Sequence, residues 1–204
     1  MFSHSASNTE TDIGTLRHDE RQREIIVAAQ KLIAERGVEG LRIRDVADSV
    51  GINNATLHYY FKTKEILIEA VVNQIVYKLV STYDPQRSQT LNTPVDELEA
   101  HLRDILFQMR QTPARFVVLS ELLMRSLHEP AIYAILKKTD DNWHAFLVDI
   151  LRRGIETGVF KPHLDASMMS SMIMMLLKGF NLQLNASTDD LELVLVQVRH
   201  WVMV

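Results

Sequence analysis

The 204-residue chain contains no cysteine, which excludes disulfide bonds, thiolate metal sites and thiol catalysis. Long apolar runs are also missing. The densest one, MMSSMIMMLL, is too short to span a bilayer and is followed by Lys178. The N-terminal segment has no apolar core of the kind that signal peptides carry, so we expect a cytoplasmic protein with no membrane segment.

Residue arrangements typical of enzymes are equally scarce. There is no glycine-rich phosphate loop, and Ser120 and Glu121 do not follow a strand as a hydrolase nucleophile would. Five histidines of the C-terminal two-thirds stand apart from one another, none paired at metal-ligand spacing: His101, His128, His144, His163 and His200. We therefore expect no cofactor and no metal, and an α-helical enzyme is the least favoured interpretation.

An excess of one charge is lacking too. The net charge is −4, from 22 basic and 26 acidic residues. Residues 17–78 hold 10 Lys and Arg against 9 Asp and Glu, and the rest of the chain holds 12 against 17. This mild asymmetry permits a small nucleic-acid module on an acidic body without demanding one.

What the sequence has is helical periodicity. Residues 1–18 are polar, and we expect a disordered tail. From residue 19 onward, apolar residues recur at helical spacing, and no segment alternates as a half-buried strand does. Helix N-cap residues precede five of the helical segments: Asn53 or Asn54, Thr63, Thr93, Asp165, and Thr188 or Asp189. The sequence predicts an all-α fold of about nine helices, with a polar loop in YDPQRSQTLNTP.

One stretch, VADSVGINNATLHYYFKTKE, breaks a good helix pattern at Gly51 and resumes after two asparagines. Two short helices joined by a glycine-containing turn are typical of a helix-turn-helix. With Leu57 and Phe61 inward, the second helix presents Asn54, Ala55, His58 and Tyr59 outward. Thr56 and Tyr60 then lie at its edges. Such groups can contact base edges and phosphates. The alternative is a tight helical corner with solvent-exposed polar residues.

The stretch IRDVADSVGINNATLHYYFKTKEILIEAVV also resembles the DNA-binding signature of the tetracycline-repressor (TetR) family of bacterial regulators. The similarity covers about residues 20–75. It implies a dimeric regulator with a three-helix DNA-binding head at residues 19–64 and a helical ligand-binding and dimerisation domain at residues 65–204.

The resemblance implies contacts at matching positions. Arg44 would reach a base or phosphate, Tyr59 and Tyr60 the backbone, and Lys64 a phosphate. The turn and the start of the recognition helix match at Asn53, Asn54, Ala55 and Thr56. Two residues depart from the pattern: His58 stands where the family usually has Tyr, and Arg42 where it often has a capping Thr. Arginine cannot accept the capping hydrogen bond, so we expect Arg42 to contact a phosphate or to leave the start of this helix less stable.

The last two helices are apolar over a wide arc, which predicts burial on two sides. A partner subunit would supply the second side, as the resembling family's four-helix interface implies; a well-covered monomer core is the alternative. The expected interface residues are Met168, Met172, Met175, Leu195, Val198, Trp201 and Val202.

Large aromatic and methionine side chains occupy the middle helices, where the resembling family encloses its effector. Such side chains suit an adaptable apolar pocket, although ordinary core packing explains them as well. The expected effector-binding residues are Phe107, Gln108, Phe116, Met124, Trp143, His144 and Phe146.

Together these features predict a homodimeric transcriptional repressor that binds a palindromic double-stranded DNA operator and is released by a small hydrophobic or aromatic effector. The alternative from another class is a small-molecule-binding helical protein whose DNA-binding head is degenerate.

Overall fold

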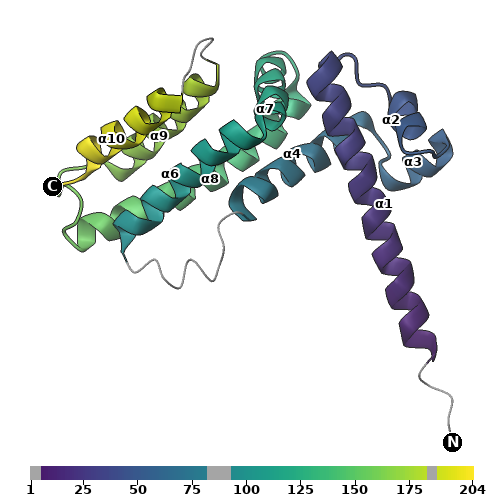
Figure 1. Cartoon of the computed structure of the whole chain (residues 1–204), viewed down its shortest axis with the longest axis horizontal. Helices are drawn as coiled ribbons and strands as arrows, with labels where there is room; N and C mark the ends of the chain where they lie inside the picture. The colour runs from purple at the N-terminus through teal and green to yellow at the C-terminus, as the bar shows by residue number, and fades with distance from the viewer. Residues whose placement is uncertain (1–5, 82–92, 183–187) are drawn as a thin grey trace, which may run out of the picture. The chain divides into compact units, whose positions relative to one another are not determined.

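The computed structural model describes residues 6–81, 93–182 and 188–204 (Figure 1). Within these ranges the chain is helical without any strand, and one isolated β-bridge joins Phe160 to Met203. The helices are α1 (Ala6–Arg36), α2 (Ile43–Ser49), α3 (Asn54–Tyr60), α4 (Lys64–Ser81), α6 (Pro94–Gln111), α7 (Pro113–Ser126), α8 (Pro130–Glu156), α9 (Ala166–Asn181) and α10 (Thr188–Val202). The all-α prediction is confirmed.

None of the helices in the described ranges combines the length and the apolar character that crossing a membrane requires. Most of the loop predicted from YDPQRSQTLNTP lies outside the described residues. Residues 1–74 and 75–204 form two compact units, and the boundary falls within α4. The sequence placed this boundary about ten residues earlier, at the start of the same helix.

The first unit is built on α1, whose inward residues Ile25, Ala29 and Ile33 are almost fully buried. The helix begins at Ala6, whereas the sequence predicts a disordered tail over residues 1–18. At its other end Gly37 has φ 71°, a left-handed conformation that stops a helix at little steric cost when the residue is glycine.

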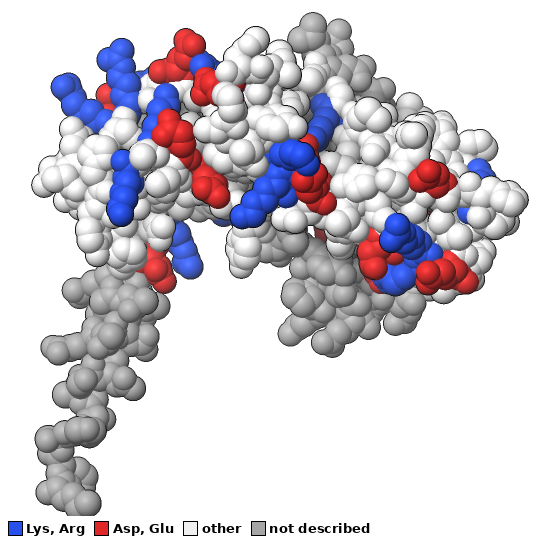
Figure 2. Space-filling view, turned by 180° about the vertical axis from the view of Figure 1, so that it is seen from behind, with Lys and Arg blue, Asp and Glu red and all other residues white. Residues whose placement is uncertain are grey.

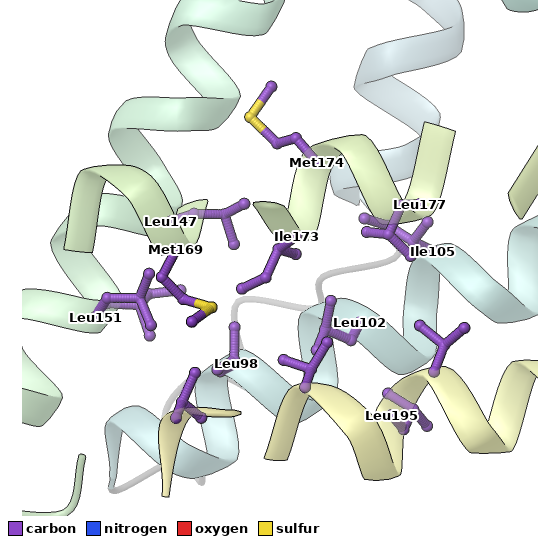
Figure 3. Close-up of a cluster of buried hydrophobic side chains, with 14 of the residues drawn as sticks. Leu98, Leu102, Ile105, Leu147, Leu151, Met169, Ile173, Met174, Leu177 and Leu195 are labelled. Atoms are coloured by element: carbon purple, nitrogen blue, oxygen red, sulfur yellow. The ribbon is translucent and has the colours of Figure 1, made fainter. Parts of the chain in front are cut away.

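The second unit has one hydrophobic core shared by α6, α8, α9 and α10. Figure 3 shows the side chains of this core converging from the four helices: Leu98 and Leu102, Leu147 and Leu151, Met169 and Ile173, and Leu195. Local caps fix where two of these helices begin. Thr93 accepts a hydrogen bond from the backbone N–H of Asp96, and Asp165 accepts from those of Ser167 and Met168.

Polar contacts hold α6 and α8 together at the edge of this core. Arg153 on α8 donates two hydrogen bonds to Glu97 on α6, at 2.9 and 2.5 Å. The hydrogen bond to Glu97 is the main reason why the pKa of Arg153 is raised. Close to it, Gly154 leaves room for the ring of buried Phe160, because a Cβ at residue 154 would lie 1.9 Å from that ring.

Candidate DNA-binding surface and effector region

A tight turn positions α3, the predicted recognition helix. Gly51 has φ 68°, and the backbone N–H of Ile52 donates to the carbonyl of Ala47 at 3.0 Å, which turns the chain sharply after α2. Asn53 then accepts a hydrogen bond from the backbone N–H of Thr56 at 2.8 Å and caps α3. Since this side-chain oxygen is already bonded within the chain, Asn53 has a structural role whatever else it contacts.

The faces of α3 are those that the sequence predicts. Leu57 and Phe61 are 0% and 1% exposed, so they anchor the helix to its own unit. The side chains that point to solvent are those of Asn54, Ala55, His58 and Tyr59, and those of Thr56 and Tyr60 are partly exposed. The outward face therefore carries amide, hydroxyl, imidazole and phenol groups, which can donate to and accept from DNA.

Two basic residues at the start of α2 are exposed. Arg42 occupies the N-cap position but makes no capping hydrogen bond, as expected for a side chain that cannot accept one. The guanidinium of Arg44 lies 3.9 Å from the carboxylate of Asp48, and both side chains are largely solvated. An exposed pair of this kind contributes at most about 0.5 kcal/mol to stability, so it leaves Arg44 able to exchange its partner for a phosphate.

Like Asn53, Lys64 is a predicted DNA contact whose side chain already has a partner within the fold. Its ammonium donates to the backbone carbonyl of Val38 at 2.7 Å, joining the start of α4 to the loop after α1. A phosphate contact by Lys64 would have to share this ammonium with the Val38 carbonyl.

The structure adds His18 of α1, which the sequence gave no reason to select. Its ring lies 4.8 Å from that of Tyr60 and 6.1 Å from that of Tyr59, centroid to centroid. The two tyrosine rings meet edge to face at 5.4 Å. No local pattern could have identified this residue, because it is about forty positions from its partners.

Charged residues of both signs are interspersed on the face shown in Figure 2, without a patch of a single sign. The face in this view therefore has no broad basic surface of the kind that binds DNA nonspecifically. Arg42, Arg44 and Lys62, beside or within α2 and α3, are exposed cations that could pair with phosphates.

The residues predicted to surround an effector fall into three groups. Trp143 and Phe146 form one cluster with His101, which was not among the predicted residues: the indole N–H of Trp143 donates to Nε2 of His101 at 2.8 Å, and the rings of His101 and Phe146 meet at 4.9 Å. His144, beside them on α8, lies with its Nε2 3.1 Å from the carbonyl of Ser167 on α9.

The second group is Gln108 and Phe116, which are buried at the junction of α6 and α7. The side-chain oxygen of Gln108 accepts from Arg115 at 2.9 Å and from Thr112 at 3.2 Å. The third group, Phe107 and Met124, is exposed by 54% and 56%. These two residues therefore do not lie in an enclosed cavity of the described structure.

A pocket does lie between α6 and α10, but its volume is only about 80 Å³. Ligand sites usually measure about 300–1,000 Å³. Its lining includes Leu98, Leu102, Phe160 and Leu195, and none of the residues predicted to bind an effector. Charged residues, among them Glu99, Glu192 and Arg199, also line this pocket, which is therefore not the predicted effector site.

The predicted interface residues divide by helix. On α9, Met168, Met172 and Met175 are exposed by 60%, 37% and 62%. On α10 the orientation differs from the prediction. Leu195, Val198 and Val202 are buried in the chain's own core, so they present no surface to a partner, and Trp201 is partly buried. Among the side chains of α10 that the structure describes, Leu193 and Val196 are exposed apolar residues. Helical periodicity could not single them out, because the helix is apolar on nearly every side.

Comparison with known proteins identifies the family. Residues 25–71 match the family model described as "Bacterial regulatory proteins, tetR family". Residues 94–203, more than half of the chain, match the model "BetI-type transcriptional repressor, C-terminal". The chain belongs to the TetR family. It is a DNA-binding transcriptional regulator, since the family and the relatives named below are regulators and not enzymes.

The relatives are distant but similar along most of their length. The HTH-type transcriptional repressor KstR2 of Mycolicibacterium smegmatis is 27% identical over 153 residues, which cover 75% of this chain and 74% of that protein. A putative TetR-family regulator from Rhodococcus sp. has a TM-score of 0.79 at 25% identity, covering 91% of this chain and all of that one. A putative regulator from Saccharomonospora viridis, solved in complex with choline, has a TM-score of 0.78 at 24% identity, with 91% and 99% covered.

Burial of His101 makes the stability of this TetR-family protein depend on pH. Burial lowers the pKa of His101 from 6.5 to about 4. Between these values the unfolded chain binds a proton that the folded chain does not, so the stability present above pH 6.5 is lost as the pH falls. The loss in the free energy of unfolding should reach at most about 3 kcal/mol, because one pKa unit corresponds to about 1.4 kcal/mol.

Urea unfolding of His101→Gln between pH 7.5 and 4 tests this expectation, since glutamine keeps an acceptor for Trp143 but does not titrate. The variant should lose less stability on acidification than the parent. The matched control is His163→Gln, at an exposed histidine. If both variants keep the parent's dependence on pH, His101 is not the group responsible.

Proposed function

We propose that the protein is a repressor that binds a palindromic operator as a homodimer, with α3 of each subunit in the major groove. The observation that carries this proposal is the outward face of α3, held in place by buried Leu57 and by the Asn53 cap. In this docking Asn54, exposed near the start of the helix, bonds a base edge. Thr56, Tyr59 and Tyr60 bond the DNA backbone.

The apolar surface of the last two helices supports the homodimer. Met168, Met172 and Met175 recur at spacings of four and three residues along α9, and Leu182 continues the same stripe beyond the helix end. Leu193 and Val196 add exposed apolar groups on α10. A second copy of the chain would cover this surface with its own identical surface, because a two-fold interface uses the same patch on both subunits. The interface we propose therefore keeps the predicted α9 residues and replaces Leu195, Val198 and Val202 by Leu193 and Val196.

The proposed effector is a small, largely apolar molecule that contacts the His101, Trp143 and Phe146 cluster. Trp143 is partly buried and Phe146 is 38% exposed, so both rings can meet a ligand without unfolding of the core. Effector binding would favour a state in which the two heads fit the operator poorly. Such a protein would act in the cytoplasm, where its operator lies. The neighbour solved with choline adds one specific cation to the candidates, because aromatic rings also bind quaternary ammonium groups.

Substitutions on α3 should separate base recognition from backbone contact. Asn54→Ala should weaken operator binding by about 1–3 kcal/mol and relax the preference at one base pair of each half-site. Thr56→Ala should weaken binding to all DNA sequences to a similar degree. Equilibrium binding to the selected operator and to operators with single base-pair changes would measure both effects. If both variants bind like the parent, α3 does not recognise the operator. That result would favour the alternative, a small-molecule-binding protein whose DNA-binding head is degenerate.

The exposed apolar stripe should be the dimer contact. Met175→Asp and Leu193→Asp each place two carboxylates in the proposed seam, one from each subunit, and should convert the dimer to monomers in sedimentation equilibrium. Val117→Asp is the matched control, since Val117 is a comparably exposed apolar residue on α7. Dimers of unchanged affinity in both stripe variants would place the interface elsewhere.

Effector and operator should weaken each other by the same factor. A ligand that lowers operator affinity tenfold must itself bind the DNA complex tenfold more weakly, a coupling of about 1.4 kcal/mol. The chain has two tryptophans, so in a Trp201→Phe variant the fluorescence of Trp143 alone reports binding. Hydrophobic compounds and choline would be screened by this signal and by thermal shift, followed by operator binding with each hit.

Two results would contradict this part of the proposal. Hits that stabilise the protein while leaving operator affinity unchanged would remove the link between the two sites. Hits that bind Trp143→Phe and Phe146→Ala with the parent's affinity would place the effector away from the aromatic cluster.

A further inference from the structure

An aromatic contact joins α1 to the recognition helix at the proposed DNA-binding surface. The ring of His18 packs on Tyr60 at a tilt of 36° and meets Tyr59 nearly edge on, at 82°. His18 lies N-terminal to residues 25–71, the part that matches the family model of the DNA-binding head. The contact therefore belongs to a segment that the family resemblance does not cover.

The contact matters most for Tyr59, because 73% of that residue is exposed. A tyrosine this exposed has few neighbours to restrict its rotamers, and ordering it on DNA costs binding free energy. The rings of Tyr60 and His18 limit this freedom before DNA arrives, since edge-to-face aromatic pairs have a preferred geometry. The three rings form a triad in which His18 is the member outside α3.

We infer that His18 is a positioning residue for operator binding: its ring holds the phenols of Tyr59 and Tyr60 in the orientation in which their hydroxyls meet the DNA backbone. This inference rests on the proposed function, specifically on the backbone contacts of the two tyrosines. The ring of His18 provides this positioning, so replacing His18 with another aromatic residue should preserve the positioning of the two tyrosines. The carboxylate of Asp19 lies 3.7 Å from Nδ1 of His18, and His18→Phe, which cannot pair with it, tests the ring alone.

The first test compares two substitutions in the full-length chain. His18→Ala removes the ring and should weaken operator binding about two- to tenfold, the range that corresponds to an aromatic pair. His18→Phe keeps a ring of similar shape and should bind within about twofold of the parent. His163→Ala, at an exposed histidine of the other unit, is the matched control and should bind as the parent does.

The second test asks whether His18 acts through the hydroxyls. A variant with both Tyr59→Phe and Tyr60→Phe keeps the two rings and their packing but removes the groups that would contact DNA. In this background His18→Ala should cause little further loss, because orientation no longer matters for the missing hydroxyls. Thermal unfolding of each variant shows whether the fold is intact. Adding His18→Ala should leave the unfolding midpoint close to that of the parent chain or of the double phenylalanine variant, so that any loss of binding reflects lost positioning.

The outcomes discriminate clearly. Parent-like binding by His18→Ala would overturn the inference, and so would equal losses in His18→Ala and His18→Phe, which would mean that the imidazole itself contacts DNA. A full loss on adding His18→Ala to the double phenylalanine variant would also overturn it. If the double phenylalanine variant alone binds like the parent, the proposed tyrosine contacts fail. If that variant weakens binding while His18→Ala does not, only the inference about His18 fails.

Discussion

Burial of Leu57 is the constraint on which the proposed DNA-binding face depends. A seven-residue helix makes too few internal hydrogen bonds to be stable alone, so α3 exists because its inner side is packed. With Leu57 inside and Phe61 buried immediately after the helix, the rotation of α3 about its axis is determined. Asn54, His58 and Tyr59 then point to solvent. The same residues that hold the helix thus decide which side chains can meet DNA.

The elements that could be predicted from the sequence are those determined by nearby residues. The Asn53, Thr93 and Asp165 caps each act within three residues, and all three are found as hydrogen-bonded caps, although for α3 the sequence left Asn53 and Asn54 as alternatives. Gly37 and Gly51 take the left-handed conformations that their positions after helices suggest. For the same reason, the inward and outward sides of α3 followed from helical spacing alone.

The parts that could not be predicted depend on contacts between distant residues. His18 meets Tyr59 and Tyr60 across more than forty positions, and nothing in the polar segment around it signals an aromatic partner. Helix α10 is apolar on nearly all sides, so the sequence does not show which of its faces is buried. Packing against the rest of the unit buries Leu195 and Val198 and leaves Leu193 and Val196 exposed. The middle helices show the same limit. Phe116 is core, whereas Phe107 is mostly exposed, although both are large aromatic residues in helices.

The central claim is that two copies of α3, related by a two-fold axis, read the operator. Selection of binding sites from a random pool of double-stranded DNA by the purified protein tests it most directly. The account predicts an enriched inverted repeat whose half-site centres are separated by about one helical turn, or a multiple of it. An enriched motif without a two-fold repeat, or no enrichment over the starting pool, would contradict it.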